Sequence, residues 1–92
     1  MGKIFTVSEI NKYISNIISN DNILSYVRVK GEISNFKYHS SGHMYFTIKD
    51  DKSLMKCVMF KSNVQKLVFA PENGTKVIVD GKISIYDRDG IY

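Results

Sequence analysis

Two hydrophobic periods divide the chain. Between Val7 and Ile18, apolar side chains recur every three or four residues, which predicts an amphipathic helix. Thr6 followed by Glu9 is a capping-box signal for its start, and the run 20–22 (Asn-Asp-Asn) is typical of its end. We expect the apolar face of this helix to pack on its own domain, with docking of another subunit as the alternative.

From Ile23 onward, apolar and polar residues alternate as they do in half-buried strands. Strands are predicted in "YVRVKGEISNF", "HMYFTIK", "LMKCVMF" and "KVIVDGKISIY", and a short helix near Ser62 to Leu67. The segment 50–53 and the later "DRDG" are expected turns, because Asp and Ser side chains bond to the local backbone there. In "HMYFTIK", Met44, Phe46 and Ile48 should face inward.

The order of these elements predicts a mainly β protein. Glycines inside strand patterns, at Gly31 and Gly81, indicate bulges or tight bends that curl a sheet. The pattern matches a five-stranded Greek-key barrel of the OB-fold type, with an N-terminal α-helix and a short helix between strands 3 and 4. A small sandwich is the alternative. We expect residues 1–22 to form a helical extension and residues 23–92 the barrel, cut in its last strand, so that the open edge could drive self-association.

Composition narrows the class of protein. The chain has 92 residues, enough for one domain, and 13 Lys and Arg against 9 Asp and Glu give a net charge of +4, which favours a polyanionic partner. Its single cysteine excludes an internal disulfide and suits a reducing compartment, so we expect a cytoplasmic location. No apolar run approaches the ~18 residues of a membrane span, so no membrane partner is expected.

The residue types of catalysis and metal binding do not form a constellation here. His39 and His43 are four apart but straddle a Ser-Ser-Gly loop, and Cys57 is predicted to face the core. Asp50 and Asp51 fall in a turn without a third acid nearby. We therefore predict no catalytic residue and no metal site in this chain.

Cations and aromatic rings on the outward face of the strands make a stronger case. Single-stranded nucleic acid is bound by cations that follow the phosphates and by aromatic faces on which bases stack. Cover by the N-terminal helix is the alternative for the aromatic residues, and a plain solvated surface for the lysines. The candidates for nucleic-acid binding are Arg28, Lys30, Phe36, Lys37, His43, Tyr45, Lys49, Lys56, Phe60 and Arg88.

Four segments, "FTVSEINKYI", "VRVKGEISNFK", "SSGHMYFTIKDD" and "MKCVMFK", resemble in order and spacing the N-terminal region of the exodeoxyribonuclease VII large subunit. The resemblance runs from about Ile4 to Tyr92. It implies a bacterial nuclease that degrades single-stranded DNA to oligonucleotides and pairs with several copies of a small helical subunit through regions outside this chain. The first region of that family is similar to the OB-folds of tRNA anticodon-binding domains and is taken as its DNA-binding part.

The resemblance places the catalytic region of the enzyme, with any Mg²⁺ it uses, outside these residues, and it implies no cofactor within them. The expected function is a single-stranded DNA-binding OB domain. Two alternatives remain open, namely a protein-interaction module that organises subunits and an anticodon-type tRNA-binding domain. A small metal-dependent nuclease in its own right is a third class, which the absence of clustered acids disfavours.

Overall fold

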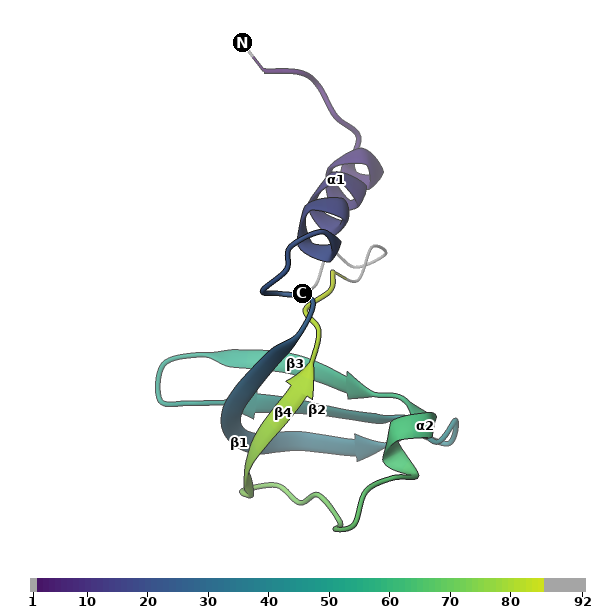
Figure 1. Cartoon of the computed structure of the whole chain (residues 1–92), viewed down its shortest axis with the longest axis vertical. Coiled ribbons are helices and arrows are strands. Elements are labelled where there is room, and N and C mark those ends of the chain that lie inside the picture. Colours follow the sequence, from purple (N-terminus) through teal and green to yellow (C-terminus); the bar gives the residue numbers. More distant parts are fainter. Residues whose placement is uncertain (1, 86–92) are drawn as a thin grey trace. The chain divides into compact units, whose positions relative to one another are not determined.

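A computed structural model of the chain describes residues 2–85. They form two compact units, one from residues 2–28 and 79–85 and one from residues 29–78. The elements along the chain are α1 (Val7–Ser19), β1 (Val27–Tyr38), β2 (Met44–Lys49), β3 (Leu54–Met59), α2 (Lys61–Val64) and β4 (Lys76–Gly81), labelled in Figure 1.

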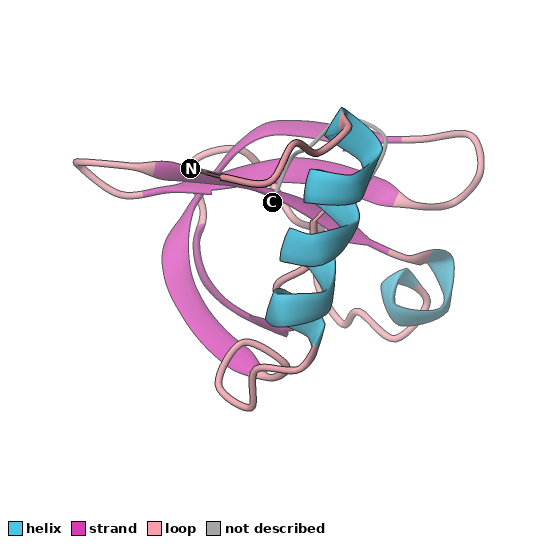
Figure 2. Ribbon diagram, turned by 90° about the horizontal axis from the view of Figure 1, so that it is seen from above, coloured by secondary structure: helices cyan, strands magenta, loops and turns pink. Residues whose placement is uncertain are grey.

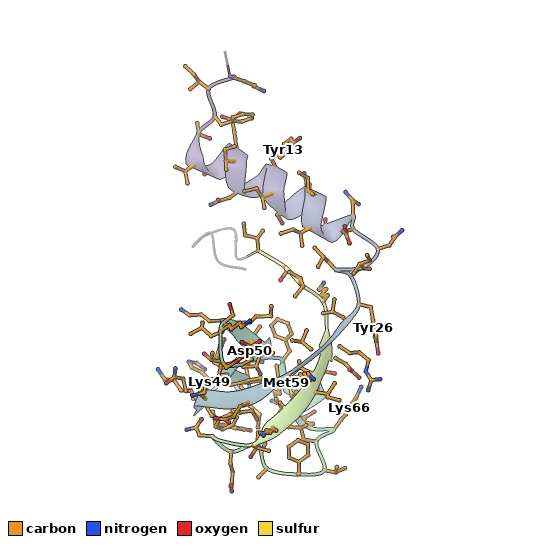
Figure 3. The ribbon with its side chains drawn as sticks, turned by 90° about the vertical axis from the view of Figure 1, so that its left-hand side faces the viewer. Tyr13, Tyr26, Lys49, Asp50, Met59 and Lys66 are labelled. Atoms are coloured by element: carbon orange, nitrogen blue, oxygen red, sulfur yellow. The ribbon has the colours of Figure 1, made fainter. Side chains whose placement is uncertain are left out.

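Helix α1 begins and ends where the sequence predicts. The hydroxyl of Thr6 accepts a hydrogen bond from the backbone N–H of Glu9 at 3.1 Å, and the Glu9 carboxylate accepts from the Thr6 N–H at 3.0 Å, which completes the capping box. Figure 2 shows one unbroken helix. None of its residues is buried, and Tyr13 projects from it in Figure 3. Packing of the apolar face on its own domain is therefore not confirmed.

The strands form one sheet in the order β3-β2-β1-β4. β1 pairs antiparallel with β2, and β2 with β3. The predicted five-stranded barrel is not confirmed, because residues 2–85 contain a four-stranded sheet in which β3 and β4 are the outermost strands. The expected turn at 87–90 and the strand after it lie outside the described residues. β4 is also shorter than predicted, since it ends at Gly81.

The core of the sheet lies on the face that the alternation predicts. Ile33, Met44, Phe46 and Ile48 are buried, so the inward assignment of the three β2 residues is confirmed. We call the side of the sheet on which these four side chains lie the core face. Across the β2–β3 pair, Met59, Cys57 and Met55 stand opposite these β2 residues, but they are only partly covered because β3 is an outermost strand of the described sheet.

One extra residue in β1 interrupts its alternation. Ser34 pairs with Thr47 and Lys37 with Tyr45, so Asn35 and Phe36 together stand opposite a single residue of β2. Asn35 has a φ of 50°, in the left-handed region that Asn tolerates better than most residues. This β-bulge shifts the alternation of side chains in β1 by one residue. As a result, Phe36 lies on the core face and Lys37 on the opposite face.

A loop residue holds the bulge in place. The side-chain oxygen of Asn73 accepts a hydrogen bond from the Phe36 N–H at 3.0 Å, and the N–H of Gly74 donates to the Ile33 carbonyl at 2.8 Å. The register irregularity does not fall at Gly31, where the sequence suggested it. Gly31 instead serves close approach, since a Cβ there would stand 3.1 Å from the Lys49 carbonyl oxygen.

The bulge makes the conformation of Asn35 testable. Asn35→Val should lower the free energy of unfolding by about 1–3 kcal/mol, because a β-branched side chain is strained at positive φ. Asn35→Gly is the matched control and should leave stability unchanged or slightly higher, because glycine has no Cβ to strain. Urea unfolding of both variants measures the difference. Equal stability of the two would contradict a left-handed residue at this position.

Candidate nucleic-acid interface

The side of the β1–β2–β3 sheet opposite the core face carries cations, hydroxyls and one aromatic ring. The register arranges these side chains in three cross-strand rows, which we call the outer face. Successive rows are separated by two residues, or about 7 Å along a strand. The rows are Lys37, Tyr45 and Val58; Ser34, Thr47 and Lys56; and Glu32, Lys49 and Leu54.

Tyr45 is the aromatic centre of the first row. Its residue surface is 38% exposed, and the ring of His39 contacts it edge-on with centroids 6.0 Å apart. Lys37 on one side and Val58 on the other are exposed as well. A half-exposed ring beside a free cation offers the two contacts that a nucleotide needs, a face for the base and a charge for the phosphate.

The middle row contains two small side chains, those of Ser34 and Thr47. Thr47 lies on the outer face, yet it is buried, with 7% of its surface exposed, and Ser34 beside it is half-buried. Lys56 at the end of this row is exposed. Small hydroxyl side chains therefore lie between the row of Tyr45 and the row of Lys49.

The loop between β1 and β2 is fastened at the same end of the sheet as Tyr45. His43 accepts a hydrogen bond at Nδ1 from the N–H of Lys61, the first residue of α2, at 2.9 Å, and its ring contacts Phe60 edge-on at 5.4 Å. His39 accepts at Nδ1 from the Ser41 N–H at 3.1 Å. Both histidine rings therefore accept backbone hydrogen bonds that stabilise the loop, whereas Phe60 is 55% exposed.

The third row differs because its cation is paired. Lys49 Nζ lies 3.9 Å from a Glu32 carboxylate oxygen, and both side chains are partly exposed. The adjoining turn has the predicted geometry, since Asp50 Oδ1 accepts from the N–H groups of Lys52 and Ser53, both at 2.8 Å. These two backbone hydrogen bonds hold the pKa of Asp50 below its ordinary value.

Several predicted site residues are not among the side chains assigned to the outer face. The prediction that Phe36 points outward is wrong, since the bulge places it on the core face, where it lines an open hollow of about 540 Å³ with Tyr38, Met44 and residues 64 and 67–71. Arg28 belongs to the other unit and is ion-paired with Asp80 at 2.9 Å. Arg88 lies outside the described residues.

Metal-binding and membrane-spanning features are not found in the part of the chain that the structure describes. No group of three or more His, Cys, Asp or Glu side chains there could hold a metal ion. Burial raises the pKa of the Cys57 thiol, which disfavours its thiolate form. None of the described helices has the length and apolar content needed to cross a membrane.

The fold agrees with the protein family whose model matches this chain. The model of a family described as "OB-fold nucleic acid binding domain" covers residues 5–92. The chain belongs to this family. Members of this fold class bind oligonucleotides on one face of a curved sheet, and the strands that form that face include the second and third.

Several relatives carry a more particular name. The chain is 61% identical over 92 residues to the exodeoxyribonuclease 7 large subunit of Ruminiclostridium cellulolyticum, which covers 100% of this chain and 23% of the relative. It is 56% identical over 90 residues to that of Clostridium acetobutylicum, covering 98% and 23%. For Clostridium kluyveri the identity is 58% over 90 residues, covering 98% and 22%. The chain thus spans less than a quarter of the length of these relatives.

The outer face contains features that the sequence reasoning did not select. The pairing of Glu32 with Lys49 is one such feature, because pairing across strands requires the register. The contact of His39 with Tyr45 was missed for the same reason. The sequence contains one weak indication of the bulge, an asparagine inside an otherwise regular strand pattern. Asn is enriched at positive φ.

The turn at Asp50 gives a pH prediction. Its pKa is lower in the folded than in the unfolded state, so its ionised form stabilises the fold above about pH 4, and this contribution is lost as the pH falls through the folded-state value. Asp50→Ala should therefore lower stability at neutral pH, and the difference from the wild type should shrink below about pH 4. Urea unfolding at a series of pH values measures it.

Asp51→Ala is the control for this experiment, because the two turn hydrogen bonds end on Asp50. The same pH-dependent loss in both variants would contradict the assignment.

Proposed function

We propose that the outer face binds single-stranded DNA and that the chain is the nucleic-acid-binding part of an exodeoxyribonuclease large subunit. The observation that carries the proposal is the row of Lys37, Tyr45 and Val58 beside the exposed Lys56. The membership of the OB-fold nucleic acid binding family and the names of the relatives support it.

In the proposed site, lysine side chains contact the phosphates and the Tyr45 ring stacks on a base. Lys37 stands on β1 and Lys56 on β3, the two strands that flank β2. Phosphates can therefore approach Tyr45 from both sides. A base must be unpaired to lay its π-face on the ring. Since base stacking and phosphate contacts read no base edges, we expect little sequence preference and a preference for single over double strands.

In the longer polypeptide, this domain would hold the strand for hydrolysis by a catalytic region outside this chain. A small subunit would bind elsewhere on that polypeptide. These roles rest on the name of the relatives, which denotes an exodeoxyribonuclease with a large subunit.

A protein-interaction role is the second candidate, and α1 supplies its observation. The helix buries none of its residues, and Val7 and Ile17 are 78% and 57% exposed. A solvent-exposed apolar face of this kind is typical of a partner-binding helix. Sedimentation of the purified chain over a range of concentrations would reveal self-association through it.

A fluorescence titration with labelled oligonucleotides separates the candidates. Single-stranded DNA, duplex DNA and single-stranded RNA of equal length are compared at several salt concentrations. We expect the tightest binding for single-stranded DNA and an affinity that falls linearly with salt on logarithmic axes. Preference for RNA would favour the anticodon-type function, and absence of binding together with self-association would favour the interaction module.

Tyr45 is expected to act as the stacking platform. Tyr45→Ala should weaken binding of single-stranded DNA by about 1–3 kcal/mol, the usual loss when one stacked base loses its ring. Tyr45→Phe keeps the ring and should bind nearly as the wild type does. Phe36→Leu, a change on the core face, should leave affinity unchanged. A larger loss from the Phe36 variant than from Tyr45→Ala would place the DNA on the other side of the sheet.

Lys56 is expected to contact a phosphate. Lys56→Gln should reduce the slope of log affinity against log salt by about 0.7, the value for one contact with a single strand. Lys66→Gln removes the same charge from the segment after α2 and serves as the control, with no change of slope. Identical slopes for both variants would exclude Lys56 from the binding path.

A further inference from the structure

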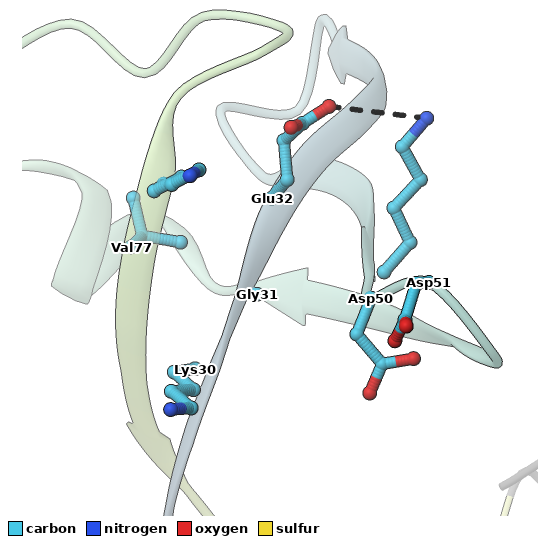
Figure 4. A pocket seen from close by; sticks show the side chains of 8 residues that line it. Lys30, Gly31, Glu32, Asp50, Asp51 and Val77 are labelled. Carbon is cyan, nitrogen blue, oxygen red and sulfur yellow. Dashed lines mark ion pairs between the residues drawn. The ribbon is translucent and has the colours of Figure 1, made fainter.

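An open hollow lies at the end of the sheet that carries the turn at residues 50–53, which we call the turn end. Its lining contains as many cationic as anionic side chains. The hollow has a volume of about 580 Å³, and Figure 4 shows the side chains that line it around Gly31. Three of its lining residues are cationic and three are anionic. They are Lys30, Lys49 and Lys76, and Glu32, Asp50 and Asp51.

Two carboxylates of this hollow, Glu32 and Asp50, lie close to Lys49 in the structure or the sequence. Glu32 stands opposite Lys49 in the register, with 3.9 Å between the carboxylate oxygen and Nζ (Figure 4). Asp50 follows Lys49 directly, and its lowered pKa keeps it ionised at neutral pH. A phosphate that approached Lys49 would therefore meet negative charge on the neighbouring strand and in the turn.

The opposite end of the outer face has different electrostatics. Lys37 and Lys56 are exposed, and neither forms an ion pair with another residue of the part of the chain that the structure describes. The register places Tyr45, the ring that offers a base its face, directly beside Lys37. The unpaired Lys37 and the aromatic ring thus lie together at one end of the face, Lys56 stands in the middle row, and the ion-paired Lys49 lies at the other end.

We propose that Glu32 limits the path of single-stranded DNA on the outer face, because it neutralises Lys49 and repels phosphates from the turn end. The strand then crosses the sheet over the rows of Tyr45 and Thr47 and does not extend over Lys49. This inference rests on the proposed function, and it adds to it a negatively charged residue that sets where the site ends.

Removal of the charge should convert Lys49 into a phosphate contact. Glu32→Gln keeps the size of the side chain and removes its charge. One additional contact steepens the slope of log affinity against log salt by about 0.7, which corresponds to about five- to tenfold tighter binding at 50 mM salt. A purely structural role of Glu32 would change stability but would not steepen this slope.

The experiment is a titration of the whole chain with a fluorescent oligothymidylate across salt concentrations. Wild type and Glu32→Gln are compared with Glu72→Gln, which removes the same charge from an exposed loop residue outside the hollow. The proposal requires the steeper slope in Glu32→Gln and an unchanged slope in Glu72→Gln. Equal effects of both substitutions would reduce the result to net charge and overturn the proposal.

A double variant identifies the route through Lys49. Lys49→Gln alone should leave the slope close to that of the wild type, because Glu32 already occupies this lysine. In the Lys49→Gln background, Glu32→Gln should no longer steepen the slope. A full steepening in the double variant, or a loss of slope in Lys49→Gln alone, would overturn the role of the pair. If the wild type binds single-stranded DNA but Glu32→Gln leaves the slope unchanged, only this inference fails, whereas absence of wild-type binding removes the proposed function as well.

Discussion

The extra residue at Asn35 and Phe36 decides which side chains of β1 share a face with Tyr45. Strict alternation from Ile33 would send Phe36 outward and Lys37 toward the core. With the bulge, Lys37 stands opposite Tyr45 on the outer face, and Phe36 joins Met44 on the core face. The pairing of a cation with an exposed ring, on which the proposed site depends, therefore requires one residue in the left-handed conformation.

The bulge also links the site to the loop that precedes β4. Asn73 accepts the hydrogen bond of the Phe36 N–H, so a loop residue distant in sequence holds the register of the binding strand. On the outer face itself, charge is distributed unevenly along the strands. Lys37 and Lys56 accompany Tyr45, whereas Lys49 is paired with Glu32 near the Asp50 turn. This asymmetry is the basis of the proposed short binding path for single-stranded DNA.

Local signals were sufficient for the elements whose cause is local. The capping box of Thr6 and Glu9, the turn at Asp50 and the inward face of β2 were all predicted from the sequence, because each depends on residues a few positions apart. The orientation of Phe36 was predicted wrongly, because it depends on a bulge stabilised by Asn73 at long range. The ion pair of Lys49 was not predicted, since cross-strand partners depend on register. The last strand of the expected barrel lies beyond the described residues.

The central claim is that single-stranded DNA lies on the outer face, and two neighbouring residues of β3 test it most directly. Val58 stands in the row of Tyr45, whereas Met59 stands opposite Met44 on the core face. Methyl groups of both residues can be labelled and observed by NMR during titration with an oligonucleotide. The account predicts intermolecular NOEs and large shifts at the Val58 methyls with small shifts at Met59. Contacts of DNA to the Met59 methyl, with Val58 unaffected, would contradict it.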